Sequence, residues 1–288
     1  MTGHLVIAGL GYSGAAIAAA ARDAGMNVTA TARNPAGKQA PDGITLIPFD
    51  DAGDAIAAAT HLVITASPTE AGDPVLIRHH AALQAAQNLR WIGYCSTTGV
   101  YGDHAGGAVD ESTPPNPGTD RTKRRVTAER AWCEQARHRA VDILRLAGIY
   151  GPARSVFDDL SAGVARRIDK PDHKFSRIHV EDIAHGTLAA IATATSGVRI
   201  LNFSDDEPAA SAVVIAYAAT LLGIAPPPLI PFDDAKRSMS PMALSFWSEN
   251  RVVLNRQTKT QLNLAWRYPT YREGLAAIMD HQSRATNS

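Results

Sequence analysis

The chain has 288 residues, of which 45% are hydrophobic and 19% are charged. This composition excludes a mostly disordered chain, because disorder requires fewer apolar residues and a large net charge. The 28 Lys and Arg residues balance 28 Asp and Glu residues, so neither nucleic acid nor a membrane surface is expected as a partner.

The first half of the chain alternates between short apolar runs and helical segments. Strands are predicted at residues 4–8, 27–31, 44–49, 61–66, 91–95 and 141–146, and helices at 15–22, 52–59, 74–88 and 120–138. Such alternation is typical of right-handed β-α-β units, in which helices cover both faces of a parallel sheet. We therefore predict an α/β fold, with a Rossmann-type, doubly wound parallel sheet as the dinucleotide-binding core over residues 1–150.

The alternation weakens after residue 150. Proline-rich stretches separate short elements there, and helices are expected near 182–193, 209–222 and 271–282. We expect residues 151–288 to form a smaller carboxyl-terminal lobe that supplies the substrate pocket. This lobe would pack on the core and return in part to the core sheet.

Three further features of the sequence exclude a signal peptide or membrane span, a disulfide framework and a metal site. Residues 5–21 are apolar, but three glycines interrupt them and no basic segment precedes them, so neither a signal peptide nor a membrane span is predicted. Cys95 and Cys133 are too few for a disulfide framework. The ten histidines show no paired-ligand spacing, so no metal site is expected. We expect a cytoplasmic protein.

The stretch Gly9-Leu10-Gly11-Tyr12-Ser13-Gly14 matches G-x-G-x-x-G between a predicted strand and a predicted helix. Gly9 permits a tight turn, Gly11 lets a pyrophosphate approach the backbone, and Gly14 lets the helix pack closely on the strand. The phosphates would lie on unpaired N–H groups at the positive end of the helix dipole. The sequence therefore predicts a dinucleotide site that includes Tyr12 and Ser13, and the alternative is a tight turn that binds nothing.

The residue that closes the second predicted strand bears on the type of cofactor. NAD-binding proteins tend to have Asp or Glu there, which binds the ribose 2′-hydroxyl. This chain has Arg33, whose guanidinium suits a 2′-phosphate, so we favour NADP over NAD, with a solvated surface role as the alternative for Arg33. Asp50 could accept a hydrogen bond from the adenine amino group or only form a turn. Ala66 and Ile149 are further expected cofactor contacts.

Later motifs resemble those of a known family. Ser96-Thr97-Thr98-Gly99-Val100-Tyr101-Gly102, followed by Asp110-Glu111-Ser112-Thr113-Pro114, resembles a motif pair of the extended short-chain dehydrogenases/reductases. Residues 145–152 and 177–184 resemble the R-x-x-x-x-Y-G-P and R-x-H-V-x-D-I-A segments of that family. The resemblance, which includes the epimerase/dehydratase branch, implies a Rossmann fold, a bound dinucleotide and a substrate cleft between the sheet and the second lobe.

The resemblance also implies a catalytic Tyr, a Lys four residues later that lowers the pKa of the Tyr, and a Ser or Thr that holds the substrate oxygen. Thr97 has the hydroxyl position. With Glu129 as the acid that commonly follows the Lys, the Tyr and Lys positions fall on Arg121 and Arg125. Arg cannot shuttle a proton near neutral pH, because its pKa stays above about 12. This loss resembles the atypical members of the family.

Other groups would then have to carry the proton. If turnover exists, we expect Thr97 to orient the substrate and Tyr101, Asp103 or water to carry the proton. Arg121 and Arg125, one helical turn apart, either form a solvated face or hold an anionic substrate or a cofactor phosphate. Water loss from a sugar nucleotide is disfavoured, because residues 98–99 lack the Asp-Glu pair of the dehydratases of this family.

Three residues of the 177–184 segment are expected to be structural. Asp182 is predicted to be the N-cap of the helix that follows it. Arg177 is expected to pair with Asp182 or to reach a substrate phosphate. His179 is expected to be a packed, hydrogen-bonded core histidine.

The sequence favours an NADP-binding, oxidoreductase- or epimerase-like enzyme of the short-chain dehydrogenase type. Its reaction would be hydride transfer on a carbonyl or hydroxyl of a small or nucleotide-linked substrate. The alternative is a catalytically weak or inactive protein that senses NADP(H). By analogy with the family, a homodimer is also an expectation.

Overall fold

A parallel sheet forms the centre of the larger lobe in the computed structural model, which describes residues 2–137 and 139–286. Within those residues its seven strands follow the order β11-β7-β5-β4-β1-β2-β3. They are β1 (His4–Ala8), β2 (Asn27–Ala32), β3 (Thr45–Pro48), β4 (His61–Ile64), β5 (Trp91–Thr97), β7 (Ala140–Leu146) and β11 (Gly197–Phe203). The chain winds outward in both directions from β1 and β4, which opens a crevice at the carboxyl ends of these strands. The predicted Rossmann-type sheet is confirmed.

The two faces of the sheet bury different residues of the same strand. Leu5 and Ile7 of β1 belong to one core cluster, whereas Val6 and Ala8 belong to the other. This division follows from the alternation of side chains along a strand. Since both faces are buried, the strands are nearly continuous apolar runs, which is why their sequence pattern was readable.

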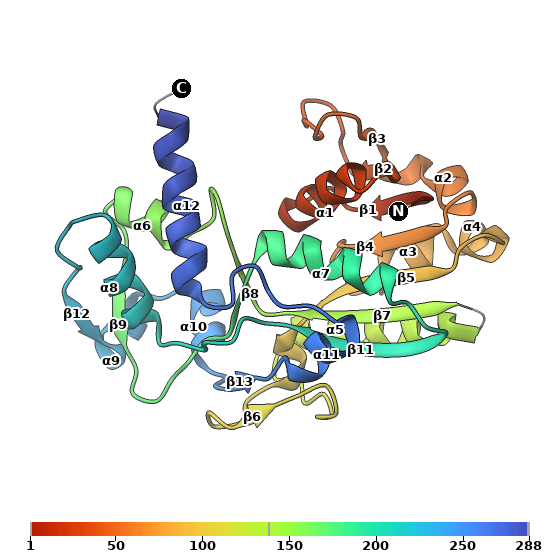
Figure 1. The fold of residues 1–288 in the computed structure, drawn as a ribbon. Helices are drawn as coiled ribbons and strands as arrows, with labels where there is room; N and C mark the ends of the chain where they lie inside the picture. Colours follow the sequence, from red (N-terminus) through yellow and green to blue (C-terminus); the bar gives the residue numbers. More distant parts are fainter. Residues whose placement is uncertain (1, 138, 287–288) are drawn as a thin grey trace.

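Helices cover both faces of the sheet (Figure 1). One face carries α1 (Tyr12–Asp23) and α7 (Val180–Ala192), which pack on each other. The other face carries α2 (Gly53–Ala57), α3 (Pro74–Arg78), α4 (His80–Ala85) and α5 (Asp120–Cys133). The single helix predicted over 74–88 is wrong, because the chain breaks at His79, whose Nε2 lies 2.8 Å from the carbonyl oxygen of Phe49. Short 3-10 turns follow β3 and α5, at Phe49–Asp51 and Glu134–Arg137.

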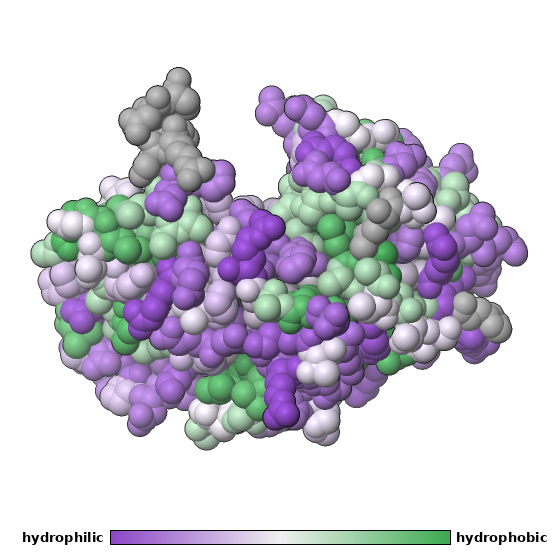
Figure 2. Space-filling view, in the orientation of Figure 1, coloured by the Kyte–Doolittle hydropathy of each residue, from purple (hydrophilic) through white to green (hydrophobic). Residues whose placement is uncertain are grey.

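The smaller lobe is built around its own apolar cluster. Phe157, Leu160, Ile215, Leu275 and Ile278 belong to this cluster. They come from α6 (Val156–Ser161), α8 (Ser211–Leu221) and α12 (Tyr271–Thr286). Short strand pairs join the segments around it, and Figure 2 shows a hollow between the two lobes at the top of the face in view.

The remaining elements are short. The paired strands are β8 (Gly148–Tyr150) with β10 (Arg177–His179), β9 (Arg167–Asp169) with β12 (Leu229–Pro231), and β6 (Ala108–Val109) with β13 (Val252–Val253). The short helical elements are the 3-10 turn Thr98–Tyr101, α9 (Phe232–Ala235), the 3-10 turn Lys236–Ser238, α10 (Pro241–Trp247) and α11 (Arg256–Leu262). Among the described residues, no helix combines the length and the apolar character needed to cross a membrane.

The chain crosses between the lobes more than once. Helix α7 and strand β11 follow residue 150 but belong to the larger lobe, where β11 pairs with β7 along its whole length. Strand β11 was not predicted. Its Arg199 forms an ion pair of 2.6 Å with the buried Asp142 of β7. Arg199 interrupts the apolar pattern of the strand, and its partner lies 57 residues earlier in the chain, so no local pattern reveals the pair.

The predicted N-cap of α7 is wrong. The helix begins at Val180, and His179 is the N-cap, with its Nδ1 accepting a hydrogen bond of 3.3 Å from the backbone N of Glu181. Asp182 lies inside the first turn and accepts from the backbone N atoms of Arg267 (2.7 Å) and Tyr268 (2.9 Å). Asp182 therefore ties the last loop of the chain to α7. His179 is buried and hydrogen-bonded, as expected.

Candidate functional site

The glycine turn after β1 is anchored by the two neighbouring strands. Gly9 has φ +112°, and its N–H donates to the Thr31 hydroxyl at 3.1 Å. The Thr65 hydroxyl donates to the Gly9 carbonyl oxygen. A Cβ at position 9 would lie 2.7 Å from Thr65 Oγ1, so both the backbone angle and the close approach require glycine here. These anchors fix the turn that leads into α1.

Gly11 and Gly14 have opposite surroundings. A Cβ on Gly14 would lie 2.4 Å from the carbonyl oxygen of Gly9, so this glycine lets α1 approach the turn, as predicted. A Cβ on Gly11 would meet no heavy atom of the described chain within 4 Å. Gly11 is also the N-cap of α1, and no described side chain makes a capping hydrogen bond there. No described side chain therefore satisfies the first N–H groups of α1 at the positive end of the helix dipole, an arrangement suited to a phosphate.

Three predicted cofactor contacts follow the carboxyl ends of the strands near β1. Arg33 comes directly after β2 and is exposed, and Asp50 lies after β3. Asp50 pairs with Arg78 at 3.3 Å, but both side chains are more than half exposed, so this pair contributes little stability. Ala66 follows β4, and its backbone N donates to the Ala8 carbonyl oxygen at 3.0 Å. All three lie at the edge where the crevice opens.

Tyr12 joins the glycine turn to the loop after β8. Its hydroxyl donates to the Pro152 carbonyl oxygen at 2.8 Å, and the Arg154 guanidinium lies 5.6 Å from the centre of its ring. The predicted contact Ile149 is on β8, beside Ile178 of β10. Tyr12 therefore links the turn to the second side of the crevice, and Ser13 lies next to it in the first turn of α1.

Thr97 lies at the carboxyl end of β5, half-buried. Its Oγ1 accepts a hydrogen bond of 3.1 Å from the backbone N of Gly99, which leaves its hydroxyl hydrogen free to donate elsewhere. A Cβ on Gly99 would lie 3.4 Å from Thr97 Oγ1 and 3.1 Å from a methyl group of Thr122. Thr97 therefore lies close to the first turn of α5, where the family has its catalytic Tyr.

The surroundings of Tyr101 disagree with the expected proton transfer. The side chain is fully buried, and its hydroxyl donates to Asn202 Oδ1 at 2.7 Å. The Arg145 guanidinium lies 4.7 Å from the ring centre and pairs with the buried Glu129 at 2.8 Å. Burial raises the pKa of Tyr101. This geometry favours a structural role, because a substrate would have to displace Asn202 to reach the phenol.

Asp103, and the further tyrosines Tyr94 and Tyr150 on β5 and β8, are equally constrained. Burial raises the pKa of Tyr94 and of Tyr150, so neither phenol ionises easily. Asp103 is exposed, and a hydrogen bond of 2.7 Å from the backbone N of Asn250 lowers its pKa. Asp103 is therefore ionised at neutral pH and cannot donate a proton there.

Arg125 is not part of a solvated face. Its Nη1 donates to the Cys95 carbonyl oxygen at 2.8 Å and to the Tyr94 hydroxyl at 3.1 Å, and its Nη2 donates to Ser67 Oγ at 2.9 Å. The guanidinium thus bridges the ends of β4 and β5. Of its five N–H donors, two make no hydrogen bond within the described chain and are available to a ligand.

Arg121 faces a different neighbour. It is exposed, and its guanidinium lies 5.0 Å from the ring centre of Phe246 on α10. This cation–π contact connects α5 of the larger lobe with α10 of the smaller lobe. Although Arg121 and Arg125 are one turn apart, only Arg125 binds the strand ends.

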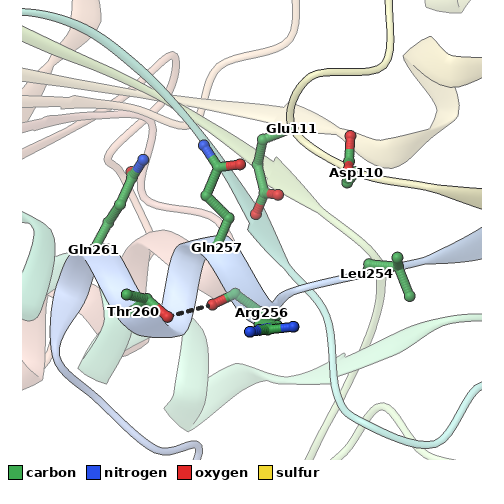
Figure 3. Close-up of a pocket in the computed structure, with 7 residues that line it drawn as sticks. All are labelled: Asp110, Glu111, Leu254, Arg256, Gln257, Thr260 and Gln261. Atoms are coloured by element: carbon green, nitrogen blue, oxygen red, sulfur yellow. Dashed lines mark hydrogen bonds between the residues drawn. The ribbon is translucent and has the colours of Figure 1, made fainter.

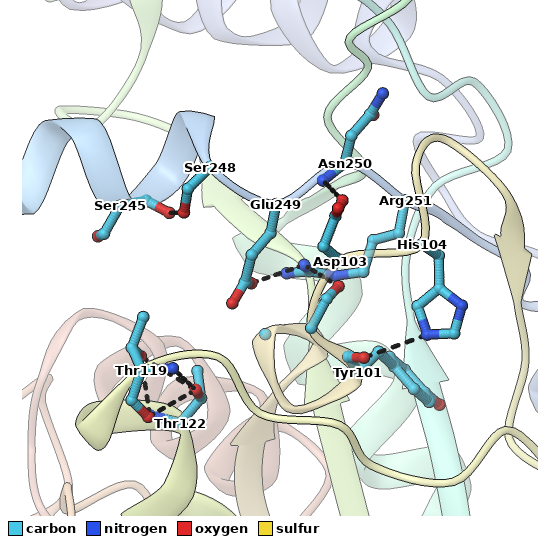
Figure 4. A network of polar contacts seen from close by, with 12 residues as sticks. Tyr101, Asp103, His104, Thr119, Thr122, Ser245, Ser248, Glu249, Asn250 and Arg251 are labelled. Atoms are coloured by element: carbon cyan, nitrogen blue, oxygen red, sulfur yellow. Dashed lines mark hydrogen bonds and ion pairs between the residues drawn. The ribbon is translucent and has the colours of Figure 1, made fainter.

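A segment of the smaller lobe, residues 249–251, contacts the loop that follows β5 (Figure 4). Arg251 donates to the Gly102 carbonyl oxygen and to Glu249 Oε2, both at 2.8 Å. The second oxygen, Glu249 Oε1, is buried without a hydrogen-bond partner, and a Cβ on Gly118 would lie 2.7 Å from it. Sequence reasoning missed this segment, because no motif marks it in the weakly patterned second lobe.

Arg177 and the motif residue Glu111 have structural roles. Arg177 does not pair with Asp182; its Nη1 donates to the carbonyl oxygens of Phe175 (2.9 Å) and Ala209 (3.0 Å). Glu111 of the E-x-T-P motif accepts from the Thr258 hydroxyl at 2.6 Å and so anchors α11. It lines a cavity of about 370 Å³ with six others (Figure 3): Asp110, Leu254, Arg256, Gln257, Thr260 and Gln261. This cavity shares no residue with the glycine turn or with Thr97.

No described group of three or more His, Cys, Asp or Glu side chains is arranged to hold a metal ion. The carboxyl edge of the sheet instead combines an unobstructed Gly11, a free hydroxyl hydrogen on Thr97 and a fixed guanidinium on Arg125.

No protein-family model matches this chain. Two known sequences are similar to it. Protein YeeZ of Escherichia coli (strain K12) is 32% identical over 242 residues, which cover 77% of this chain and 85% of YeeZ. The 3-diazoavenalumate denitrifying reductase of a Streptomyces species is 28% identical over 178 residues, or 58% of each chain.

Solved structures extend the comparison over nearly the whole chain. A functionally unknown conserved protein from Silicibacter pomeroyi DSS has a TM-score of 0.89 and 41% identity, and the match covers 97% of this chain and 99% of that one. MoeE5 in complex with UDP-glucuronic acid and NAD has a TM-score of 0.76 and 19% identity, with 98% and 100% of the chains covered. At that identity the match shows the fold.

Proposed function

Since this chain belongs to the family of Escherichia coli YeeZ and has the NAD-dependent epimerase/dehydratase fold of the extended short-chain dehydrogenases/reductases, we propose that it is an NADP-dependent oxidoreductase. Its substrate is a carbonyl or hydroxyl compound that is small or nucleotide-linked and carries a negative charge. The observation that carries this proposal is the uncapped start of α1 at Gly11, at the same edge of the sheet as the free hydroxyl hydrogen of Thr97 and the guanidinium of Arg125.

The residues at the crevice suit a dinucleotide. The backbone N–H groups at the start of α1 would hold its pyrophosphate, because Gly11 leaves the space open and nothing in the described chain caps the helix there. Arg33 at the end of β2 supports NADP, since a guanidinium binds a 2′-phosphate and would gain nothing from a 2′-hydroxyl. Asp50, Ala66 and Ile149 are proposed to line the adenine and nicotinamide parts of the site. When bound, the nicotinamide would supply or accept the hydride.

Thr97 and Arg125 would orient the substrate. The Thr97 hydroxyl has one hydrogen free to donate to a substrate oxygen. The Arg125 guanidinium, held by three hydrogen bonds, would stabilise negative charge that develops on that oxygen. Because an Arg keeps its proton, the proton that completes the reaction would come from water. Tyr101 is a poorer candidate, since its hydroxyl is buried and donates to Asn202.

The test is oxidation of NADPH in the presence of carbonyl compounds, including nucleotide-linked sugars that bear a keto group. We expect turnover with at least one anionic carbonyl compound. Thr97→Ala should lower kcat/KM roughly ten-fold to a hundred-fold, because one hydrogen bond to the reacting oxygen is lost. Thr127→Ala is the matched control, since Thr127 is exposed on α5 and its hydroxyl donates only to a helix carbonyl. Equal rates for wild type and Thr97→Ala would contradict this assignment.

A second candidate function follows from the loss of the Tyr–Lys pair. A protein that binds NADPH tightly without turning it over would act as a sensor of NADP(H). The observation that favours a sensor is at Arg121, which occupies the position of the catalytic Tyr in the family resemblance. Its guanidinium contacts Phe246 of the other lobe. Tight binding of NADPH with no loss of its near-ultraviolet absorbance, when a metabolite extract is added, would support the sensor over the enzyme.

A further inference from the structure

A second cavity lies at the opposite edge of the sheet, where β4, β5 and β7 begin. Its volume is about 570 Å³. Its polar lining includes Thr2, His61, Gln87, Arg90, Arg139 and Ser196. The carboxyl ends of the same strands face the crevice with Thr97, so the two sites lie at opposite ends of the sheet (Figure 1).

Two arginines stand side by side in this cavity. Trp91 of β5 pairs with Ala140 of β7, and Arg90 and Arg139 are the residues directly before them. The backbone confirms that they are neighbours, since the N of Ala140 donates to the Arg90 carbonyl oxygen at 2.9 Å. Like charges at adjacent positions of paired strands are destabilising. Both arginines line the same cavity, so their two positive charges favour an anionic ligand there.

No acidic side chain of the described chain supplies that anion. The cavity lining contains no Asp or Glu, and neither arginine forms an ion pair with a described residue. The nearby carboxylate of Asp142 is already bound by Trp91 Nε1 at 2.6 Å and by Arg199 at 2.6 Å. The Nη1 atom of Arg139 is buried with no hydrogen-bond partner, and such an unpaired charged donor costs free energy.

The other groups in the cavity do not oppose a negative charge. His61 is neutral, since burial and then the positive charge of Arg90 lower its pKa to about 4. Hydroxyl donors come from Thr195 and Ser196, which follow α7. The volume lies in the range of roughly 300–1,000 Å³ that is usual for small-molecule sites, so the cavity can hold more than a bare ion.

We propose that this cavity binds a small phosphorylated metabolite, with its phosphate between the guanidiniums of Arg90 and Arg139. A phosphate monoester fits this pair because its oxygens accept two arginine forks at once and its double charge balances both. The neutral part of the metabolite would pack on Leu89 and Ile191, which also line the cavity. Such a ligand binds without competing with a dinucleotide at the glycine turn, so the site is suited to regulation.

The test is calorimetric titration of glucose 6-phosphate, with inorganic phosphate and sulfate as comparison probes. We expect one molecule of glucose 6-phosphate to bind per chain, more tightly than either inorganic ion. Arg90→Gln together with Arg139→Gln should weaken binding roughly a hundred-fold, because two charge-assisted contacts are lost. Arg130→Gln, which removes an exposed guanidinium of α5, is the matched control and should leave binding unchanged.

Two further variants separate a loss of the binding site from misfolding and from binding at the glycine turn. Arg90→Gln alone changes an exposed side chain, so it should fold normally and weaken binding roughly ten-fold. Gly11→Asp places a carboxylate at the glycine turn and should not affect glucose 6-phosphate. Loss of binding in Gly11→Asp but not in Arg90→Gln would overturn the proposal, because the phosphate would then occupy the glycine turn.

Other outcomes would also overturn it. These are no saturable binding at millimolar concentration, or equal weak binding of phosphate, sulfate and the sugar phosphate, which would indicate an adventitious ion only. The proposal does not depend on the proposed oxidoreductase activity. A failure of NADPH to bind would leave the result at Arg90 and Arg139 unaffected.

Discussion

The start of α1 and the start of α5 form two sides of one crevice, but they retain different parts of the family's machinery. At α1 the turn has all three glycines, with Gly11 facing open space and Gly14 against the Gly9 carbonyl oxygen. At α5 the positions that the family resemblance assigns to the catalytic Tyr and Lys hold Arg121 and Arg125. Nucleotide binding depends on backbone shape, whereas proton transfer depends on one type of side chain. A chain can therefore lose the second without losing the first.

The buried end of α5 should be more sensitive to mutation than its exposed start. Glu129→Ala should lower the free energy of unfolding by about 3–5 kcal/mol, because it leaves Arg145 buried without its ion-pair partner. Lys123→Ala is the control on the same helix. It breaks an ion pair with Asp120 whose side chains are 60% and 84% exposed, so it should cost less than about 1 kcal/mol. Urea unfolding measures both, and equal losses would contradict the assignment of a buried structural pair.

Two glycines of the same turn should separate stability from binding. Gly14→Val should destabilise the fold by about 3 kcal/mol, because its Cβ would overlap the Gly9 carbonyl oxygen. Gly11→Val should cost less than about 1 kcal/mol, since open space surrounds the new side chain, yet it should abolish detectable NADPH binding. Urea unfolding and titration of NADPH on both variants check this. A Gly11→Val variant that is as unstable as Gly14→Val would show that the turn has no open face.

The two arginines of α5 should differ in their effect on activity. Arg125→Met should lower kcat/KM roughly a hundred-fold, because the proposed role of this guanidinium is to stabilise negative charge on the reacting oxygen. Arg121→Met removes only an exposed cation–π contact, worth roughly 0.5–1 kcal/mol, and should change kcat/KM much less. Steady-state kinetics of NADPH oxidation measures both. Equal losses would mean that both arginines bind the substrate.

The smaller lobe should add an acid-sensitive component to stability. Burial, followed by the charge of Lys170, lowers the pKa of His173 to about 4 in the folded chain. The unfolded chain takes up its proton near pH 6.5, so it binds more protons than the folded chain between these values, and stability falls as the pH drops through that interval. At pH 5 we expect a loss of roughly 1–2 kcal/mol from this residue relative to pH 7.

His173→Phe checks that pH dependence. Both ring nitrogens of His173 are buried without hydrogen-bond partners, and the ring packs against both Phe175 and Trp247, so Phe should fit the site. Urea unfolding at pH 7 and pH 5 should show a smaller difference for the variant than for wild type. An unchanged difference would assign the acid sensitivity to other groups.

Sequence patterns predicted the core well because its strands are buried on both faces. The runs that became β1, β4 and β7 are continuous and apolar, so they could be read without the fold. Strand β11 escaped prediction because Arg199 and Asn202 interrupt it, and their partners Asp142 and Tyr101 are brought near only by folding.

The candidate site was predictable only where a motif marks it. The glycine turn and Thr97 come from local patterns, and the structure places them at the same edge of the sheet. The burial of Tyr101 and the contact of Glu249 with Gly118 depend on residues about a hundred or more positions away. No local pattern contains that information, so these contacts between distant segments had to come from the structure.

Calorimetric titration of NADPH and NADH into wild type, Gly11→Asp and Ala210→Asp tests the central claim most directly. Ala210 is the uncapped N-cap of α8 in the smaller lobe, so it offers the same substitution at a helix start outside the crevice. The account predicts that NADPH binds wild type and Ala210→Asp equally well, binds more tightly than NADH, and fails to bind Gly11→Asp. No heat from either coenzyme at millimolar concentration, or equal binding to all three proteins, would contradict it.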